Sequence, residues 1–169
     1  MSERKWFDRK FEFTFPVGLF PNLCVRLRGT PARLEEMLLD QPRARLIQRP
    51  DSKWSIQEHV GHLLDLEELW IARLHDFVKG ATQLSVADLS NRKTDEANHN
   101  AANLDDILRR FRAARTQLVT EAEKLGPELH SRTILHPRLK QPMRAVDHLY
   151  FAAEHDDHHI ARIWDLLRD

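Results

Sequence analysis

Apolar residues recur at helical spacing in four segments of the chain, and this pattern predicts an all-α fold. The alternation of apolar and polar residues that is typical of a strand is confined to residues 11–15. A short first helix is expected to start at Pro31, with Thr30 as its cap, and to end near Asp40. Residues 1–29, rich in Phe and Pro, are expected to form a lead-in that wraps the helices.

The second helix has the clearest start signal. Ser55 is followed three residues later by Glu58, which is the spacing of a capping box, and apolar residues then recur to about Val78 before Gly80. From Gly80 to Asn103 the chain is polar and long enough to connect the far ends of two helices. The sequence therefore predicts a long crossover between the second and third helices.

The third helix is expected to run from about Asn103 to the stop at Gly126 and Pro127. After a polar loop, Pro142 is expected to open a fourth helix that continues almost to the end of the chain. Three helices of about 20 residues and one shorter helix predict a four-helix bundle. At 169 residues the length suits one domain, residues 1–169.

The amino-acid composition argues against nucleic acids and membranes as partners. The 26 basic and 26 acidic residues cancel, and no basic block is present, so nucleic acid is not an expected partner. No apolar run approaches the roughly 20 residues that cross a bilayer, so no membrane partner is expected. Cys24 is the single cysteine and is expected to be a small buried residue. Without the apolar stretch of a signal peptide near Met1, a cytoplasmic location is expected.

Histidines are the strongest chemical signal. His155 and His159 lie four residues apart on the predicted fourth helix, on one face near the core, whereas His158 is expected to be solvated. A third histidine from another helix would complete a three-nitrogen metal site with open coordination positions. His59 and His62 can both look into the bundle, and periodicity does not choose between them. The alternative is that the histidines are only the polar edge of an amphipathic helix.

Glu67 and Asp156 fall at positions where a helical wheel expects apolar side chains. A buried carboxylate needs a partner. These two could accept the second N–H of a metal-bound imidazole, or they could pair with an arginine such as Arg73.

Other catalytic signatures are absent from the sequence. The chain has no His-Glu-x-x-His motif, no Cys-x-x-Cys, no Gly-x-Ser-x-Gly and no glycine-rich phosphate loop. The Glu-x-x-His spacing of di-iron bundles has one candidate, at Glu58, and Gly61 stands in place of its histidine. A di-iron site is therefore not expected.

Two segments together resemble a known family. Residues 54–67, Trp-Ser-Ile-Gln-Glu-His-Val-Gly-His-Leu-Leu-Asp-Leu-Glu, resemble the Trp-Ser-x-x-Glu-x-x-x-His-Leu-x-Asp-x-Glu signature of the DinB-like superfamily, which includes YfiT-type metal-dependent proteins. Residues 154–163, Glu-His-Asp-Asp-His-His-Ile-Ala-Arg-Ile, resemble its C-terminal His-x-x-x-His. The resemblance covers roughly residues 30–167.

This resemblance implies an up-down-down-up four-helix bundle, often a homodimer, with a divalent metal bound by His62, His155 and His159. It leaves His59 to packing or to support of a ligand. Zinc is the default ion, although nickel or iron would also suit three imidazoles.

An ion held by three histidines could lower the pKa of a thiol or a water bound to it. The favoured function is a thiol S-transferase-like enzyme that joins a low-molecular-weight thiol to a small electrophilic substrate, as members of the resembled superfamily do. The alternatives are a metal-dependent hydrolase of small amides or esters, and a non-enzymatic, stress-associated metal-binding module. No catalytic residue is identified.

Five polar residues outside the expected ligand set could reach a pocket. Arg92, Asn98 and His99 of the crossover are expected to be solvated. Tyr150 is expected to bury its ring, and the role of His136 is open.

Overall fold

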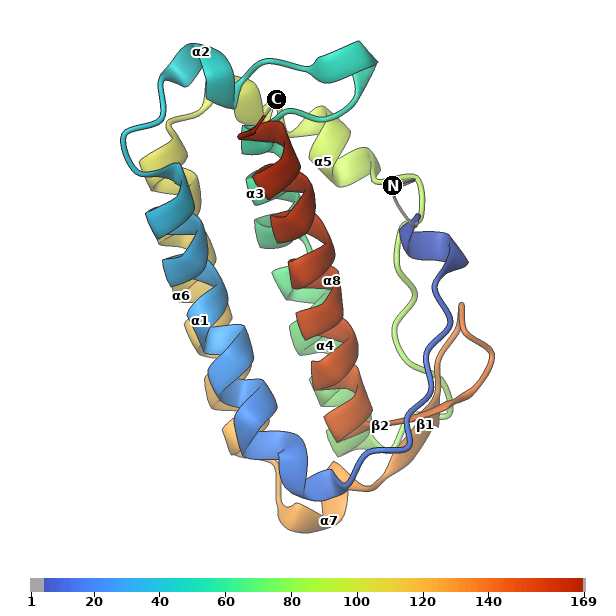
Figure 1. Cartoon of the computed structure of the whole chain (residues 1–169). Helices are drawn as coiled ribbons and strands as arrows, with labels where there is room; N and C mark the ends of the chain where they lie inside the picture. The colour runs from blue at the N-terminus through green and yellow to red at the C-terminus, as the bar shows by residue number, and fades with distance from the viewer. Residues whose placement is uncertain (1–4, 169) are drawn as a thin grey trace.

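Four helical legs form a bundle in the computed structural model, which describes residues 5–168 (Figure 1). The first leg runs up, the second and third run down, and the fourth runs up again, as the family resemblance implies. The second leg consists of two helices in succession. The legs are α1 (Phe20–Leu38), α3 (Ile56–Asp65) with α4 (Glu67–Lys79), α6 (Leu104–Glu123) and α8 (Ala145–Leu166).

Short elements connect the legs. Because the second and third legs run in the same direction, the crossover between them must return along the length of the bundle, and Figure 1 shows that it does. The leg α1 packs against α6 and α8, and the α3–α4 leg packs against the same two helices from the other side. The short elements are α2 (Arg43–Leu46), α5 (Arg92–Glu96), α7 (Pro127–His130), β1 (Thr133–Leu135) and β2 (Pro142–Arg144).

The first helix begins at Phe20, so the predicted start at Pro31 is wrong and residues 20–29 belong to α1. A proline inside a helix costs roughly 3 kcal/mol because it removes a hydrogen bond and crowds the preceding turn. Burial of Phe20, Leu23 and Leu27 offsets this cost, since each buried apolar side chain contributes about 1.5–3 kcal/mol.

The second leg starts as predicted. The Glu58 backbone N–H donates to Ser55 Oγ at 3.1 Å, and the Ser55 N–H donates to Glu58 Oε2 at 2.9 Å, which completes the capping box. The leg also ends as predicted at Gly80, whose φ of 67° suits a residue without a side chain. The prediction of one continuous helix is wrong, because the leg is interrupted at Leu66.

The third leg also starts as predicted, where Asn103 Oδ1 accepts the Asp105 backbone N–H at 2.8 Å. The fourth helix starts at Ala145, three residues after Pro142. Pro142 instead opens β2, which pairs with β1 in an antiparallel hairpin, and proline is tolerated at the first residue of such a strand. Residues 11–15, which alternate in the way typical of a strand, form no strand.

The core has two apolar clusters, one toward each end of the bundle. Leu27, Trp70, Leu118 and Ala152 belong to the first, and the second includes Leu34, Leu63, Phe111 and Ile163. Cys24 is buried in the first cluster, as expected, and burial raises the pKa of its thiol to about 11. Among residues 5–168, no helix is both long enough and apolar enough to span a membrane.

A buried polar layer separates the two apolar clusters, and each leg contributes one residue to it. Arg115 donates to Glu67 Oε1 at 2.6 Å and to Asp156. Thr30 Oγ1 donates to Asp156 Oδ2 at 2.7 Å. Arg115 is 1% exposed and also donates to the backbone oxygen of Leu27 at 3.0 Å. The partner of both buried carboxylates is therefore Arg115 and neither Arg73 nor a histidine of the predicted metal site.

Candidate metal centre

The structure brings together His62 on α3 and His155 and His159 on α8. One ring nitrogen from each lies within 4.8 Å of the other two, and all three side chains are buried. The Nε2 atoms of His155 and His159 are 3.2 Å apart. Two nitrogens bound to one zinc-sized ion at about 2.0–2.1 Å lie roughly 3 Å apart, so this spacing fits a shared ion. The three residues have the composition and proximity of a divalent-metal site.

The three imidazoles are neutral in the fold. Burial lowers the pKa of His62 to about 4, and it holds the pKa values of His155 and His159 well below the usual 6.5. A neutral imidazole has one nitrogen with a free lone pair, which is the form that binds a metal ion. At neutral pH, therefore, no proton has to leave the cluster before an ion enters.

Thr94 of α5 fixes the tautomer of His62. Thr94 Oγ1 donates its one proton to Asp65 Oδ2 at 3.0 Å, and His62 Nδ1 lies 3.0 Å from the same hydroxyl oxygen. The hydroxyl must therefore accept from His62 Nδ1–H. This leaves Nε2 as the nitrogen of His62 with the free lone pair, which is the usual arrangement around a metal-binding histidine.

His99 continues this network. Its Nε2 lies 2.8 Å from Asp65 Oδ2, and its side chain is buried, so the expectation that it is solvated is wrong. Gly61 makes this approach possible, because a Cβ there would lie 2.3 Å from atoms of the His99 ring. Arg92 and Asn98, by contrast, are exposed as expected.

His59 supports the cluster from the other side. Its Nδ1 lies 2.9 Å from Nδ1 of His159, so one of these rings donates to the other. When His159 donates, its Nε2 keeps the lone pair that faces His155. Burial lowers the pKa of His59 to about 3, so His59 is neutral, and a neutral imidazole has a nitrogen that can accept this proton. Periodicity left the role of His59 open, and the structure places it behind His159.

Aromatic rings enclose His155. The ring centroids of Trp6 and Trp70 lie 5.0 Å and 5.7 Å from that of His155. Its Nδ1 is buried and has no hydrogen-bond partner within residues 5–168. His158, expected to be solvated, is half-buried, and its ring centroid lies 5.7 Å from that of Trp6. Tyr150, expected to bury its ring, is half-buried and packs against Phe15 with ring centroids 4.9 Å apart.

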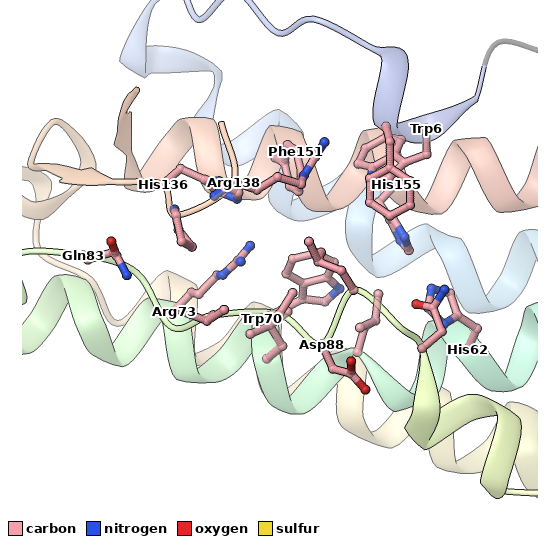
Figure 2. Close-up of a pocket in the computed structure, with 18 of the residues that line it drawn as sticks. Trp6, His62, Trp70, Arg73, Gln83, Asp88, His136, Arg138, Phe151 and His155 are labelled. Carbon is pink, nitrogen blue, oxygen red and sulfur yellow. Dashed lines mark hydrogen bonds between the residues drawn. The ribbon is translucent and has the colours of Figure 1, made fainter. Parts of the chain in front are cut away.

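Two cavities open onto the cluster, and both are lined by His62, His155 and Trp6. One has a volume of about 310 Å³ and extends past Trp70 toward His136 (Figure 2). The other has a volume of about 630 Å³ and is also lined by Trp54, His59, His158 and His159. Small molecules can therefore reach the histidines.

Replacing Thr94 by valine is expected to weaken divalent-metal binding by about 10- to 100-fold, because the acceptor that holds the His62 Nδ1–H is removed. Thr94→Ser keeps the hydroxyl and should bind within a few-fold of the native protein. The affinity is measured by competition with a chromogenic chelator. Equal affinity of Thr94→Val and the native chain would show that the hydroxyl does not orient His62.

The fold and this buried cluster define a class of helical-bundle proteins with a three-histidine site. The sequence model of the DinB superfamily matches residues 26–163, and the chain therefore belongs to that superfamily. The signal for membership was present in the two sequence motifs. The contributions of Thr94 and His99 were missed, because nothing in the local pattern of the crossover points toward the helix that it covers.

Solved structures share the fold. YfiT from Bacillus subtilis, described as a probable metal-dependent hydrolase with an unusual four-helix bundle topology, is similar over 95% of this chain and 92% of its own, with 20% identity and a TM-score of 0.81. The mycothiol-dependent maleylpyruvate isomerase is similar over 86% of this chain and 60% of its own, with 12% identity and a TM-score of 0.66. No curated protein sequence matches the chain.

Proposed function

We propose that His62, His155 and His159 bind one divalent metal ion and that the protein is an enzyme acting on a small molecule, with transfer of a low-molecular-weight thiol as its reaction. The observation that carries the proposal is the convergence of three buried, neutral imidazoles at the meeting point of two cavities. The names of the two similar structures support it, since one refers to metal-dependent chemistry and the other to a thiol.

The donor set favours an open site. Three imidazoles leave coordination positions for a thiol, a water or a substrate, whereas structural zinc sites are typically closed by four protein ligands. When bound, the ion supplies Lewis acidity that lowers the pKa of a thiol or water bound to it. Zinc is the ion we propose, and nickel or iron would suit the same donors.

Four residues around the three histidines support the site in this proposal. Under it, Thr94 accepts the Nδ1–H of His62 and His59 accepts that of His159, which would leave both Nε2 atoms to hold the ion. Trp6 and Trp70 pack against His155 and exclude water from one side of it. The homodimer and the cytoplasmic location expected from the sequence stay predictions.

Hydrolysis of a small amide or ester is the second candidate, favoured by the likeness to YfiT over nearly the whole of both chains. The two reactions differ in their need for a thiol. A thiol transferase has no turnover without one, whereas a hydrolase uses water.

The test is a pair of assays on metal-loaded protein. A panel of low-molecular-weight thiols is offered with 1-chloro-2,4-dinitrobenzene, and p-nitrophenyl acetate is offered without a thiol. We expect thiol conjugation that depends on metal and is lost in His155→Ala, while His75→Ala, an exposed histidine away from the cluster, retains it. Turnover of the ester alone would support the hydrolase. Metal binding without turnover in either assay would support the non-enzymatic alternative.

A further inference from the structure

The smaller cavity extends from the histidine cluster to a second group of polar residues that the proposed reaction does not use. Figure 2 shows His62 and His155 at one end of this cavity, Trp70 between, and Arg73, His136 and Arg138 toward the other end. Arg73 belongs to α4, and the other two belong to the loop of the β1–β2 hairpin.

Three buried nitrogen atoms in the cavity wall lack hydrogen-bond partners within the described chain. They are Trp70 Nε1, His136 Nε2 and Arg138 Nη2. The Nδ1 atom of His136 accepts the backbone N–H groups of Arg138 and Leu139 at 3.2 Å and 3.1 Å, so its proton lies on Nε2. All three atoms are therefore donors. Burying donors without acceptors is costly, which indicates a ligand that supplies acceptors.

The same end of the cavity carries uncompensated positive charge. Arg73 is 1% exposed and donates Nε–H to the backbone oxygen of Ser85 at 3.0 Å, and burial lowers its pKa to about 10. Over residues 5–168, neither Arg73 nor Arg138 forms an ion pair. Burial lowers the pKa of Arg138, and the charge of Arg138 in turn lowers that of Arg73.

Nearby carboxylates are occupied elsewhere. Asp76, the carboxylate that raises the pKa of Arg73, accepts the Ser85 backbone N–H at 2.6 Å. Asp88 lines the cavity but accepts from the backbone N–H groups of Ser90 and Arg92 and from the Ser90 hydroxyl. The guanidinium groups therefore face the cavity with room for an external anion.

Aromatic rings form the apolar part of the wall. Arg138 Cζ lies 5.6 Å from the Phe151 ring centroid and 5.9 Å from that of Trp6, and Arg73 Cζ lies 5.5 Å from that of Trp70. With a volume of about 310 Å³, the cavity suits a small organic molecule with an apolar body.

We propose that this cavity binds a small organic carboxylate, whose carboxylate accepts from Arg138, His136 and Trp70 and whose apolar body extends along Trp70 toward His155. A planar guanidinium and a carboxylate match in shape as well as in charge, which makes a carboxylate a suitable partner for Arg138. This proposal adds a substrate class to the proposed function. It rests on the proposed function only in placing the reactive end of the molecule at the histidines.

The test is isothermal titration calorimetry on metal-free protein with three probes: 3-phenylpropionate, the neutral 3-phenylpropanamide, and phenyl phosphate. We expect 3-phenylpropionate to bind at least about tenfold more tightly than the amide. Arg138→Gln should reduce its affinity by at least about tenfold, and Trp70→Phe, which keeps the ring and removes the N–H, by a few-fold. Arg109→Gln, which alters an exposed arginine paired with Asp106, should change nothing.

Equal affinities for the acid and the amide, or an unchanged affinity in both Arg138→Gln and Trp70→Phe, would overturn the proposal. Tighter binding of phenyl phosphate would overturn the choice of a carboxylate. His159→Ala, whose side chain belongs to the histidine cluster but does not line this cavity, separates this proposal from the metal-dependent function. It should retain the affinity for 3-phenylpropionate in metal-free protein, whether or not the native histidines bind an ion.

Discussion

A chain in which His155 is replaced by alanine is expected to lose stoichiometric binding of a divalent ion, with an affinity at least about 100-fold below that of the native protein. Two imidazoles remain, and they cannot complete a three-nitrogen site. The change should leave the fold intact, because His155 is neutral and its Nδ1 bonds to no group within residues 5–168.

Metal content is measured by mass spectrometry on protein purified without a histidine tag or chelators, and affinity by chelator competition. About one ion per native chain is expected. His62→Ala and His159→Ala should also lose the ion, whereas His75→Ala should hold as much as the native protein. Retention of metal by all three cluster variants would refute the assignment of these histidines as metal ligands. They would then be buried polar residues of the bundle.

Replacing Arg115 by methionine is expected to lower the free energy of unfolding by about 3–5 kcal/mol, because Glu67 and Asp156 stay buried without their cation. Arg115, Glu67 and Asp156 are almost fully excluded from solvent, and together with Thr30 they form the polar layer between the two apolar clusters. Urea denaturation at pH 7 measures the loss. Arg112→Met, on the same helix, breaks an exposed pair with Glu35 and should cost no more than about 1 kcal/mol.

The pH dependence of the free energy of unfolding provides a second test of the pairing of Glu67 with Arg115. Burial raises the pKa of Glu67 to about 7 even though Arg115 opposes the shift. A carboxyl group whose pKa is raised by folding binds more protons in the folded state, so its contribution to stability falls as the pH rises from the unfolded pKa toward 7. Without Arg115 the pKa of Glu67 should rise further, so the loss of stability in Arg115→Met should be smaller at pH 5 than at pH 8. A loss that does not vary with pH would contradict this account of Glu67.

Local sequence rules located most of the helices and failed where tertiary contacts override them. The capping box at Ser55 and the glycine at Gly80 mark real helix ends, because both act within one turn of backbone. Pro31 looks like a helix start by the same kind of rule, but burial of the preceding turns holds it inside α1. Likewise, Pro142 opens a strand because its partner β1 lies beside it.

Sequence patterns likewise located one part of the candidate site and missed the other. The spacing of His155 and His159 placed both on one face of α8, and the family motifs pointed to His62 as the third member. Arg115 was missed, because an arginine on an amphipathic helix is usually exposed and its partner Glu67 is 48 residues away. Thr94, His136 and Arg138 lie in connecting segments, whose positions depend on the helices that they cover.

The amino-acid sequence by itself determined the all-α bundle, its long crossover and the shared helix face of His155 and His159, since hydrophobic periodicity, capping and the i, i+4 spacing act between neighbours along the chain. His62 was expected only from the family resemblance. Only the tertiary structure decided which buried charges pair, which hydroxyl orients His62, and where Arg73 and Arg138 face a common cavity. These contacts join residues on different elements, and their formation depends on how the helices pack and how the crossover and hairpin fold back over them.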